Sequence, residues 1–460
     1  MKPSIEDFQH IFFIGIAGSG MSAIAQYLAG VGKQVSGSDR YFEHGQAADI
    51  RKKLEAEGIC CFNQDGNGIS ENTQLIVVST AIEPTVPEVQ KAMQMKIPIL
   101  RRSEVLALIA KSRPTIAVGG TSGKSTTSGM LFSILQQAKL DPGIISGAGL
   151  VNLIKDNKIG NAHVGDKKGW LIIEADESDG SIVLYEPEVG LLLNIDKDHQ
   201  EIETLMDVFT TFKHHTKKLF VTNQNNEYCS VLSKGEEHDF STNPAIVAGY
   251  VAHHFNQTGW TIHFIINGQP ITVHAPGHHN MENAVAAVAV ANQLGVSMYD
   301  CAIGLEQYEG IYRRHQLLGI KNGITVIDDY GHNPVKCAAS IKACQPVGKR
   351  VIAWFQPHGY GPTKFLRDDF IREISEALRD EDEIWMSEIF YAGGTAEKTI
   401  SANDLIQGIL KNGKKAFFIP NRDNLLSAMR PHLNSDCVIL LMGARDPGLE
   451  TFAKNFYQQL

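Results

Sequence analysis

The sequence predicts an α/β fold of three domains, each organised around a sheet of mostly parallel strands. Two stretches, residues 10–28 and 115–140, both have the order strand, glycine-rich turn, helix. Beyond residue 316, apolar strands alternate with helical patterns, which is typical of a doubly wound parallel sheet. The 460 residues, 43% of them hydrophobic, suffice for about three domains with sizeable cores. We place the domains at residues 1–113, 114–315 and 316–460.

The composition excludes several classes of partner. A net charge of −9 argues against nucleic acid or an anionic membrane as the main partner, although it is compatible with phosphate ligands. No apolar run reaches the ~18 residues of a membrane span, and the first ten residues lack the apolar core of a signal peptide. The seven cysteines are odd in number and show no C-x-x-C spacing, as expected for reduced thiols. We therefore expect a cytoplasmic protein without stable membrane insertion.

The first domain begins with a Rossmann-like βαβ unit. A strand from His10 to Gly15 enters the turn Gly15-Ile-Ala-Gly-Ser-Gly20, and helical spacing follows from Met21 to Leu28. A second strand, Lys33 to Ser38, leads into Asp39. Such a unit places a diphosphate at the helix N-terminus and a carboxylate near a ribose or base. Because Ala17 replaces the middle glycine of G-x-G-x-x-G, the dinucleotide signal is weak alone, and an NAD-dependent dehydrogenase is the alternative from another class.

The rest of this domain is read as further strands and helices of the same sheet. Leu75 to Ile82 is a buried strand that runs into the small polar pair Ser79-Thr80. Turn chemistry and ligand contact explain this pair equally well. A short strand from Ile97 to Leu100 precedes a helix that opens at Arg101.

The second strand–turn–helix stretch predicts a phosphate-binding loop. The strand Thr115 to Val118 is followed by glycines, Lys124, three hydroxyl residues and a helical pattern from Met130 to Leu140. Backbone N–H groups of such a loop surround phosphate oxygens, the lysine reaches the β- and γ-phosphates, and a hydroxyl of Ser125 or Thr126 joins a Mg²⁺ shell. Val118 stands where the general motif has glycine, so the loop is one residue tighter. The predicted ATP contacts here are Gly120, Thr121, Ser122, Gly123, Lys124, Ser125 and Thr126.

Two further strands of the central domain end in polar side chains. Trp170 to Glu174 begins a segment that carries four carboxylates, Glu174, Asp176, Glu177 and Asp179. Oxygen donors at a strand end beside a phosphate loop suit Mg²⁺. Val189 to His199 is another strand with a polar tip, although one histidine after a strand is more often structural than a ligand.

The central domain ends with a predicted hairpin and a long helix. Trp260 to Val273 reads as two strands around the turn Asn267-Gly268. An alanine-rich helix then begins near Pro276, with Asn280 and Asn283 on one face. Their amides can read an adenine edge, while Asn280 can also serve as a helix cap.

The third domain is predicted as a second Rossmann-like sheet, with its ligand site at the C-terminal ends of the strands. The expected strands are Ile324 to Asp329, Arg350 to His358, Glu383 to Ser387, Ala416 to Pro420 and Cys437 to Ala444. The helical patterns between them are Val335 to Lys342, Asp368 to Leu378, Ser401 to Leu410 and Asp423 to Met429.

Together these motifs resemble the Mur ligases, most closely those that join L-alanine to UDP-N-acetylmuramate. The resemblance covers essentially the whole chain and follows the family order in all three domains. It is carried by Phe13-Ile-Gly-Ile-Ala-Gly-Ser-Gly-Met-Ser-Ala-Ile-Ala25, Gly120-Thr-Ser-Gly-Lys-Ser-Thr-Thr127, Glu174-Ala-Asp-Glu-Ser-Asp179, Asn194-Ile-Asp-Lys-Asp-His199, Gly277-His-His-Asn-Met-Glu-Asn-Ala284, Asp328-Asp-Tyr-Gly-His332 and Phe355-Gln-Pro-His358.

The resemblance implies roles for individual residues. The UDP substrate is expected at Gly15, Ala17, Gly18, Ser19, Gly20, Met21, Asp39, Ser79 and Thr80, and further ATP contacts at His279, Asn280, Asn283, Arg314 and Asp329. Mg²⁺ is expected on Ser125, Glu174 and His199, and the incoming amino acid at Tyr330, His332, His358 and Lys364. The implied catalytic residues are Lys124, Glu174, His199 and His358.

The implied reaction activates the lactyl carboxylate of UDP-N-acetylmuramate with ATP, as an acyl phosphate that the amine of L-alanine then attacks. One departure concerns the amine. The family usually has two arginines after Phe-Gln-Pro-His, and this chain has Gly359 and Pro362 there, with Lys364 as the nearest cation. An arginine pair is the natural receptor for a carboxylate. A recycling ligase that attaches a preformed tripeptide therefore stays an alternative.

Overall fold

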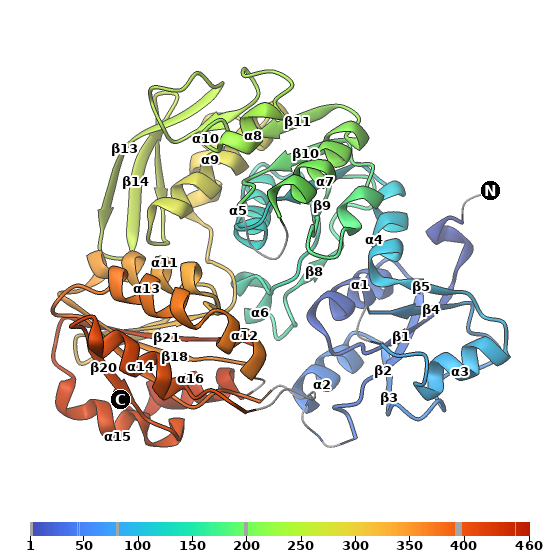
Figure 1. Cartoon of the computed structure of the whole chain (residues 1–460). Coiled ribbons are helices and arrows are strands. Elements are labelled where there is room, and N and C mark those ends of the chain that lie inside the picture. Colours follow the sequence, from blue (N-terminus) through green and yellow to red (C-terminus); the bar gives the residue numbers. More distant parts are fainter. Residues whose placement is uncertain are drawn as a thin grey trace. The chain divides into compact units, whose positions relative to one another are not determined.

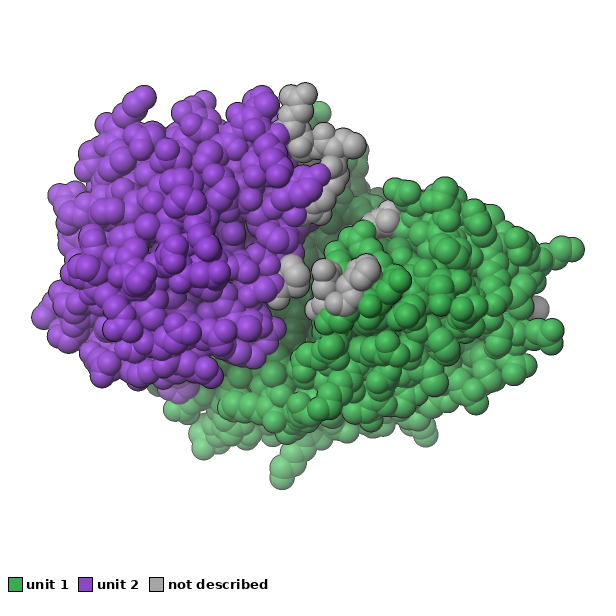
Figure 2. Space-filling model, turned by 90° about the horizontal axis from the view of Figure 1, so that it is seen from below, with its two compact units in different colours: residues 1–255, 264–273, 279–311 green, residues 256–263, 274–278, 312–460 purple. Residues whose placement is uncertain are grey.

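The structure is a computed structural model that describes residues 3–43, 45, 47–79, 82–196, 201–391, 398–446 and 448–460 (Figure 1). The chain forms two compact units (Figure 2). Unit 1 comprises residues 1–255, 264–273 and 279–311, and unit 2 comprises residues 256–263, 274–278 and 312–460. No helix of the described residues is long and apolar enough to cross a membrane.

The first sheet of unit 1 has five parallel strands in the order β3-β2-β1-β4-β5. Its central strands are buried on both faces, which explains their continuous apolar runs. The strand order reverses between β1 and β4, so the glycine turn after β1 lies at the switch point where such sheets bind ligands. The strands are β1 (His10–Ile14), β2 (Gln34–Ser38), β3 (Cys60–Phe62), β4 (Leu75–Val78) and β5 (Ile99–Arg101), and the helices are α1 (Ser19–Gly30), α2 (Ala48–Ala56), α3 (Pro87–Gln94) and α4 (Arg102–Lys111).

The second sheet of unit 1 has six strands in the order β11-β10-β6-β9-β7-β8, parallel except for β8. Strand β6 lies at its centre between β10 and β9, which brings three strand ends together around the phosphate loop. The strands are β6 (Thr115–Gly119), β7 (Gly143–Ile145), β8 (Ala162–His163), β9 (Leu171–Glu174), β10 (Val189–Leu192) and β11 (Leu219–Thr222), and the helices are α5 (Lys124–Gln137), α6 (Val151–Lys155), α7 (Ile202–His215), α8 (Glu227–Val231), α9 (His278–Gln293) and α10 (Met298–Glu306).

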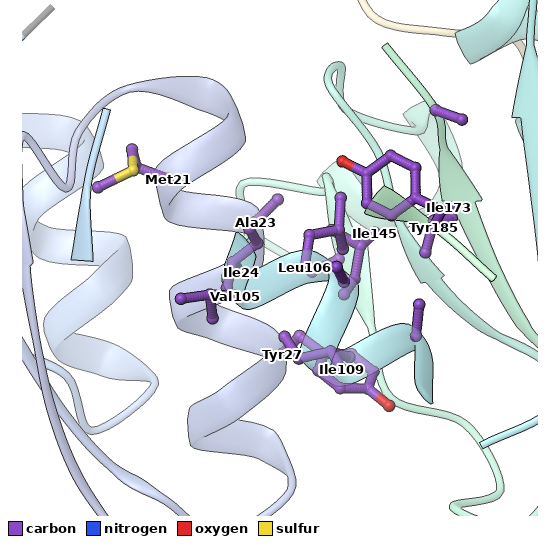
Figure 3. Close-up of a cluster of buried hydrophobic side chains, with 14 of the residues drawn as sticks. Met21, Ala23, Ile24, Tyr27, Val105, Leu106, Ile109, Ile145, Ile173 and Tyr185 are labelled. Atoms are coloured by element: carbon purple, nitrogen blue, oxygen red, sulfur yellow. The ribbon is translucent and has the colours of Figure 1, made fainter. Parts of the chain in front are cut away.

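One hydrophobic cluster joins these two sheets. Ile24 and Tyr27 of α1 pack with Val105 and Ile109 of α4 and with side chains of the second sheet region such as Ile173 (Figure 3). The buried guanidinium of Arg113 also links them, because it donates to the hydroxyl of Tyr27 on α1 and to the carbonyl of Val164 after β8. Residues 1–113 therefore share one compact unit with the phosphate-loop sheet. The division into three domains, with boundaries after residues 113 and 315, stays a prediction.

A four-stranded sheet, β12-β13-β14-β15, follows within the central region. The predicted turn is present between β14 and β15, where Asn267 and Gly268 have φ of 48° and 83°. Two consecutive positive φ values match the right-handed twist of a hairpin and explain the Asn-Gly pair. The sequence did not predict the first two strands of this sheet. The strands are β12 (Phe240–Ser241), β13 (Tyr250–Thr258), β14 (Thr261–Ile266) and β15 (Gln269–Val273).

Unit 2 contains the six-stranded sheet β16-β17-β21-β18-β19-β20, parallel apart from the pairing of β16 with β17. The five predicted strands all occur; β16 was missed because none of its residues is fully buried. The strands are β16 (Gln316–Lys321), β17 (Ile324–Asp329), β18 (Arg350–Gln356), β19 (Glu383–Met386), β20 (Lys415–Phe418) and β21 (Cys437–Gly443), and the helices are α11 (Pro334–Cys344), α12 (Tyr360–Phe365), α13 (Arg367–Ala377), α14 (Ala402–Lys411), α15 (Leu425–Met429) and α16 (Leu449–Gln459).

The α/β class with mostly parallel sheets is thus confirmed. One helix start was predicted too late: the phosphate-loop helix α5 begins at Lys124, six residues before the helical pattern at Met130. Its first turn carries hydroxyl residues and a glycine, which hide the apolar periodicity, while the tertiary contacts of the loop hold this turn in place.

Candidate active site

The phosphate loop connects β6 to α5 and has a backbone that requires glycine at two positions. Gly120 and Gly123 have φ of 138° and 82°, in the region that other residues rarely adopt. A Cβ on Gly123 would lie 2.5 Å from Oδ1 of Asn283, and one on Gly120 would lie 3.0 Å from Cβ of Leu193. The loop is therefore packed closely against α9 and against the end of β10, and larger residues at these glycines would push the elements apart.

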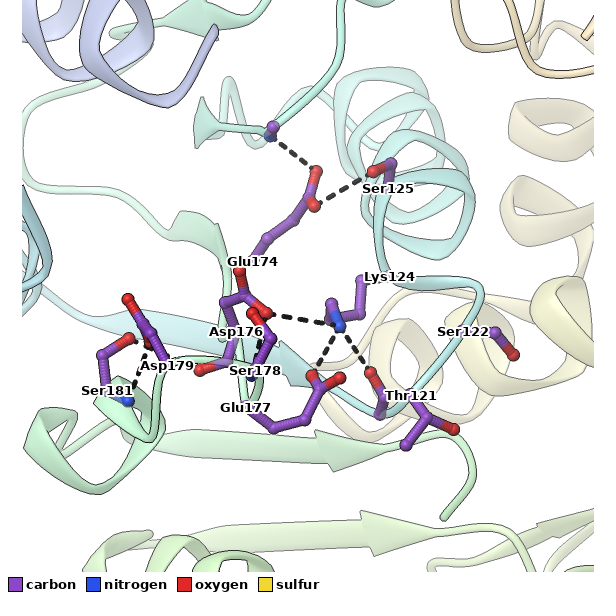
Figure 4. A network of polar contacts seen from close by, with 12 residues as sticks. Thr121, Ser122, Lys124, Ser125, Glu174, Asp176, Glu177, Ser178, Asp179 and Ser181 are labelled. Atoms are coloured by element: carbon purple, nitrogen blue, oxygen red, sulfur yellow. Dashed lines mark hydrogen bonds and ion pairs between the residues drawn. The ribbon is translucent and has the colours of Figure 1, made fainter. Parts of the chain in front are cut away.

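Lys124, the first residue of α5, is held over its own loop (Figure 4). Its Nζ donates to the carbonyl of Gly120 at 2.7 Å and to Oε2 of Glu177 at 2.5 Å, and it lies 3.8 Å from Oδ1 of Asp176. Burial raises the pKa of Glu177 despite the nearby ammonium. Burial acts in the same direction on Asp176, but the Lys124 charge, the hydrogen bonds from Ser178 and the Arg102 charge together outweigh it and lower that pKa. The cation thus points at the centre of the loop, where phosphate charge is expected.

Glu174, at the end of β9, is positioned from both sides. Its Oε2 accepts a hydrogen bond from Oγ of Ser125 at 3.0 Å, and its Oε1 accepts from Oγ of Ser146 at 2.5 Å and from N of Gly147 at 2.9 Å. Ser146 and Gly147 were not predicted from the sequence. They follow β7, which pairs with β9. The sequence pattern that could have indicated them is a Ser-Gly pair directly after the short strand that contains Ile144 and Ile145. This arrangement joins the predicted Mg²⁺ ligands Ser125 and Glu174.

His199, the third predicted metal ligand, lies outside the described residues. Within the part of the chain that the structure describes, no three His, Cys, Asp or Glu side chains gather in a way that could hold a metal ion. Ser125 and Glu174 provide a hydroxyl and a carboxylate, which are hard oxygen donors of the type that Mg²⁺ binds alongside phosphate oxygens and water. The described donor set therefore fits a magnesium ion that is shared with a bound nucleotide.

Asn194 holds the tip of the loop. Its Oδ1 accepts from Oγ1 of Thr121 at 2.9 Å and from N of Ser122 at 2.8 Å, so the loop is bound to the end of β10. On the other side, Oδ1 of the buried Asn283 accepts from Oγ1 of Thr127 at 3.2 Å. The predicted adenine contact at Asn283 stays a prediction, because the observed role of its carbonyl is to fasten α9 to the loop. Asn280, one turn earlier, is also buried, His279 is exposed, and the Thr126 side chain is partly buried on α5.

The glycine turn of the first sheet leads directly into the N-terminus of α1. Gly15 has φ of 81°, Gly18 is the N-cap of α1, and no acid occupies the first turn of that helix. Asp39 is 4% exposed, and its carboxylate accepts from N of Ala17 and from N of Tyr41, both at 3.0 Å. Its observed role is therefore to brace the turn. Around it, Ser19 is exposed, Gly20 and Ser79 are partly buried and Met21 is in the core, while Thr80 lies outside the described residues.

Arg102 was not singled out from the sequence, but it lies against this turn. A Cβ on Gly20 would meet Cδ of Arg102 at 3.1 Å, and an Nη of Arg102 lies 3.9 Å from Oδ2 of Asp179. This side chain of α4 thus lies between the start of α1 and the acidic segment after β9. Its only sequence signal was an arginine pair at the start of a helix.

In unit 2, Asp329 ends β17 and is fully engaged. Its Oδ2 accepts from N of His315 at 2.7 Å, and its Oδ1 accepts from N of Gly331 at 2.7 Å and from Oγ of Ser340 at 2.9 Å. Burial opposes ionisation, but the His315 charge and these bonds lower its pKa. The predicted ribose contact at Asp329 therefore stays a prediction, as does a contact at the exposed Arg314.

The residues predicted for the amino acid surround the C-terminal ends of β17 and β18. The ring centroids of Tyr330 and His332 are 5.6 Å apart, and those of His332 and His358 are 5.9 Å apart. Burial, His332 and Arg445 together lower the pKa of His358 to about 4, so its ring is neutral at pH 7. Lys364 is exposed on α12 and donates to Oγ1 of Thr399 at 3.1 Å. Three of the four predicted side chains thus form one aromatic group.

The largely buried carboxyl group of Glu282 on α9 should make the stability of the protein depend on pH. Its Oε1 accepts from Nδ2 of Asn223 at 2.5 Å, and burial raises its pKa from 4.5 to about 7. The folded chain then holds a proton that the unfolded chain releases, so stability should fall as the pH rises from about 4.5 through 7. We expect Glu282→Gln to increase the free energy of unfolding at pH 8 by about 1–2 kcal/mol, seen as a higher melting temperature, and to change both little at pH 5. The exposed Glu227→Gln is the control, and an equal gain at both pH values would contradict this role of burial.

Comparison with known proteins identifies the family. The chain matches the descriptions "Mur ligase family, catalytic domain" over residues 10–114, "Mur ligase middle domain" over 118–291 and "Mur ligase, glutamate ligase domain" over 313–445. It is 34% identical over 460 residues to a UDP-N-acetylmuramate–L-alanine ligase of Desulforapulum autotrophicum, covering 95% of this chain and 96% of that protein.

Two solved structures share the fold over nearly the whole chain. The UDP-N-acetylmuramate–alanine ligase MurC of Thermotoga maritima has a TM-score of 0.79 at 23% identity, covering 98% of each chain. A murein peptide ligase of Psychrobacter arcticus has a TM-score of 0.64 at 21% identity, also covering 98% of each chain. With three domain matches in family order and a relative above 30% identity along its length, the chain belongs to the Mur ligase family.

Proposed function

We propose that this chain is an ATP-dependent ligase that joins L-alanine to the lactyl carboxylate of UDP-N-acetylmuramate, in the cytoplasmic synthesis of peptidoglycan precursors. The observation that carries the proposal is the phosphate loop, in which Lys124 and the Ser125–Glu174 pair meet at the ends of β6 and β9. The relative from Desulforapulum autotrophicum, which bears this activity in its name, supports the substrate assignment. Membership of the Mur ligases argues against the NAD-dependent dehydrogenase.

The site residues suit a two-step ligation. A carboxylate is a poor electrophile, so the γ-phosphoryl group of ATP is transferred to it, giving an acyl phosphate and ADP. The amine nitrogen then attacks the carbonyl carbon, and inorganic phosphate leaves. Lys124 offsets negative charge on the transferred group, since its ammonium lies over the loop that holds the phosphates. His358 is neutral at pH 7 and lies with Tyr330 and His332 on the amine side.

Magnesium is the proposed metal. When bound, it would neutralise phosphate charge, with Ser125, Glu174 and His199 as its protein ligands. Ser146 and Gly147 would keep the Glu174 carboxylate turned toward Ser125. This role of neighbouring hydrogen bonds is general for metal ligands, because they fix the orientation of the donor atom.

A test of the metal site follows. Glu174→Gln removes a charged donor of the pair with Ser125, so we expect the Mg²⁺ concentration for half-maximal phosphate release to rise about tenfold or more. Ser146→Ala should have a smaller effect in the same direction, because it removes only one hydrogen bond to Glu174. The control is Glu186→Gln, a surface carboxylate paired with Lys111 at 2.8 Å. An unchanged Mg²⁺ titration for Glu174→Gln would rule out the assignment.

The function itself is tested by phosphate release from ATP with UDP-N-acetylmuramate and a panel of amines. L-alanine should support release, and the other amino acids should do so poorly. The second candidate is a ligase for a preformed tripeptide. It stays open because Gly359 and Pro362 stand where the family usually has arginines. Release with the tripeptide and none with L-alanine at any attainable concentration would replace the first proposal by the second.

A further inference from the structure

The amine side of unit 2 contains an arginine at the end of the strand beside that of His358. Strands β18 and β21 are parallel, and Gln356 is paired with Gly443. His358 and Arg445 each follow two residues after this pair, so both leave the same edge of the sheet. Arg445 is exposed, and its charge acts on the His358 ring, which agrees with the register.

Several other cations of unit 2 already have partners. Nε of Arg313 is 3.0 Å from Oδ2 of Asp328, and Arg422 pairs with the buried Asp446. Lys364 donates to Thr399, and Lys398 lies over the rings of Tyr360 and Tyr391. The Arg445 guanidinium has no hydrogen bond or ion pair to any residue that the structure describes. Arg314 is also exposed, but it precedes β16, which β17 and β21 separate from β18. Arg445, after the strand directly beside β18, is thus an exposed cation that is available to bind an anion near His358.

The backbone at Arg445 supports a role for this side chain. Its φ is 63°, in the left-handed region where a residue other than glycine is disfavoured. Glycine would relieve the strain, and Asp446 immediately afterwards is held by Arg422. The fold therefore holds a long cationic side chain in a costly conformation next to His358. Strain of this kind is common where a side chain is needed for function.

We infer that Arg445 binds the carboxylate of the amino substrate, in place of the two arginines whose positions are occupied by Gly359 and Pro362. A guanidinium matches a carboxylate with two parallel hydrogen bonds, which an exposed lysine such as Lys364 cannot reproduce. The inference rests on the proposed function, since it assumes an amine that carries a carboxylate. It makes Arg445 a specificity-determining residue that follows β21, whereas the family motif follows β18.

The test uses Arg445→Gly in the full-length chain, because glycine suits the left-handed backbone and the variant should melt at or above the wild-type temperature. Steady-state phosphate release is measured with UDP-N-acetylmuramate, ATP and either L-alanine or L-alaninamide, which lacks the carboxylate. We expect the KM for L-alanine to rise about tenfold or more, while the KM values for L-alaninamide and ATP stay within about twofold. Arg445→Lys should recover part of the loss.

Two control variants distinguish carboxylate binding by Arg445 from a general effect of losing a surface side chain. Asn322→Gly removes another exposed side chain with positive φ, 55°, from the same unit and should leave every KM unchanged. Lys349→Ala removes an exposed cation of the same unit, 3.1 Å from Asp436, and should likewise leave the KM for L-alanine unchanged. If Arg445→Gly leaves the ratio of the L-alanine and L-alaninamide KM values unchanged, the inference is wrong. It is also wrong if Lys364→Ala, which tests the competing assignment of the carboxylate to Lys364, raises the KM for L-alanine as much as Arg445→Gly is expected to do.

Failure of the proposed function has a different signature. If the wild-type chain releases phosphate with the tripeptide and not with L-alanine, the L-alanine assignment falls. Arg445→Gly is then scored on the KM for the tripeptide, which also carries carboxylates. A rise of about tenfold retains Arg445 as the carboxylate-binding residue, and an unchanged value overturns that assignment as well.

Discussion

Replacement of Lys124 by methionine is expected to reduce phosphate release by about a hundredfold or more, since one charge-assisted contact to the transferred group is worth roughly 2.7 kcal/mol in the transition state. Methionine keeps most of the length of the side chain, so the change is mainly one of charge. Binding of UDP-N-acetylmuramate, followed by calorimetry, should be largely retained, because the glycine turn that is proposed to hold it belongs to the first sheet. Residual activity above about a tenth of wild type would contradict the role of Lys124.

Glu177→Gln is the matched control for Lys124. It removes the carboxylate that lies 2.5 Å from the Lys124 ammonium but keeps the ammonium itself. If the lysine acts on phosphate, this variant should retain most of the activity. Equal losses in Lys124→Met and Glu177→Gln would instead indicate that the ion pair matters mainly for the shape of the loop.

The largest expected effect on stability comes from Arg113, which is 7% exposed. Its guanidinium donates to the carbonyls of Val164, Gly169 and Trp170 at 3.0, 3.0 and 3.1 Å, to the hydroxyl of Tyr27 at 3.1 Å, and to the carbonyl of Asp166. Arg113→Met leaves these acceptors without donors inside unit 1. We expect a loss of about 3 kcal/mol or more, seen as a lower melting temperature.

The control for Arg113 is Lys111→Met, two residues earlier. Lys111 is paired with Glu186 at the surface, with both side chains more than a third exposed. Exposed pairs contribute little, so this variant should change stability by less than about 1 kcal/mol. If the two variants melt at the same temperature, the carbonyl cluster around Arg113 contributes nothing beyond an ordinary surface charge.

The strand, loop and helix around Lys124 could be predicted from the sequence, and the contacts between strands could not. Lys124, Ser125 and the glycines belong to one continuous motif, so a short pattern sufficed. Ser146 and Asn194 reach the same place only because the sheet order sets β7 beside β9 and β10 beside β6. That order depends on long-range packing, which a single sequence does not display. For the same reason Arg445 could not be linked to His358, 87 positions apart, before β21 was seen beside β18.

Chain connectivity in the hairpin region limits how this protein can be divided. Residues 256–263 and 274–278 belong to unit 2, although they lie within the sequence of unit 1, so the chain passes between the units five times. Trp260 packs against the core of unit 2, and Nε2 of Gln257 donates to the carbonyl of Ala343 at 3.4 Å. A fragment that starts at Tyr312 would lack both side chains and expose part of that core to water. A chimera that exchanges the C-terminal region with that of a relative must therefore also exchange residues 256–263 and 274–278. A single cut of the backbone before residue 312 would leave these two segments of unit 2 on the fragment that contains unit 1.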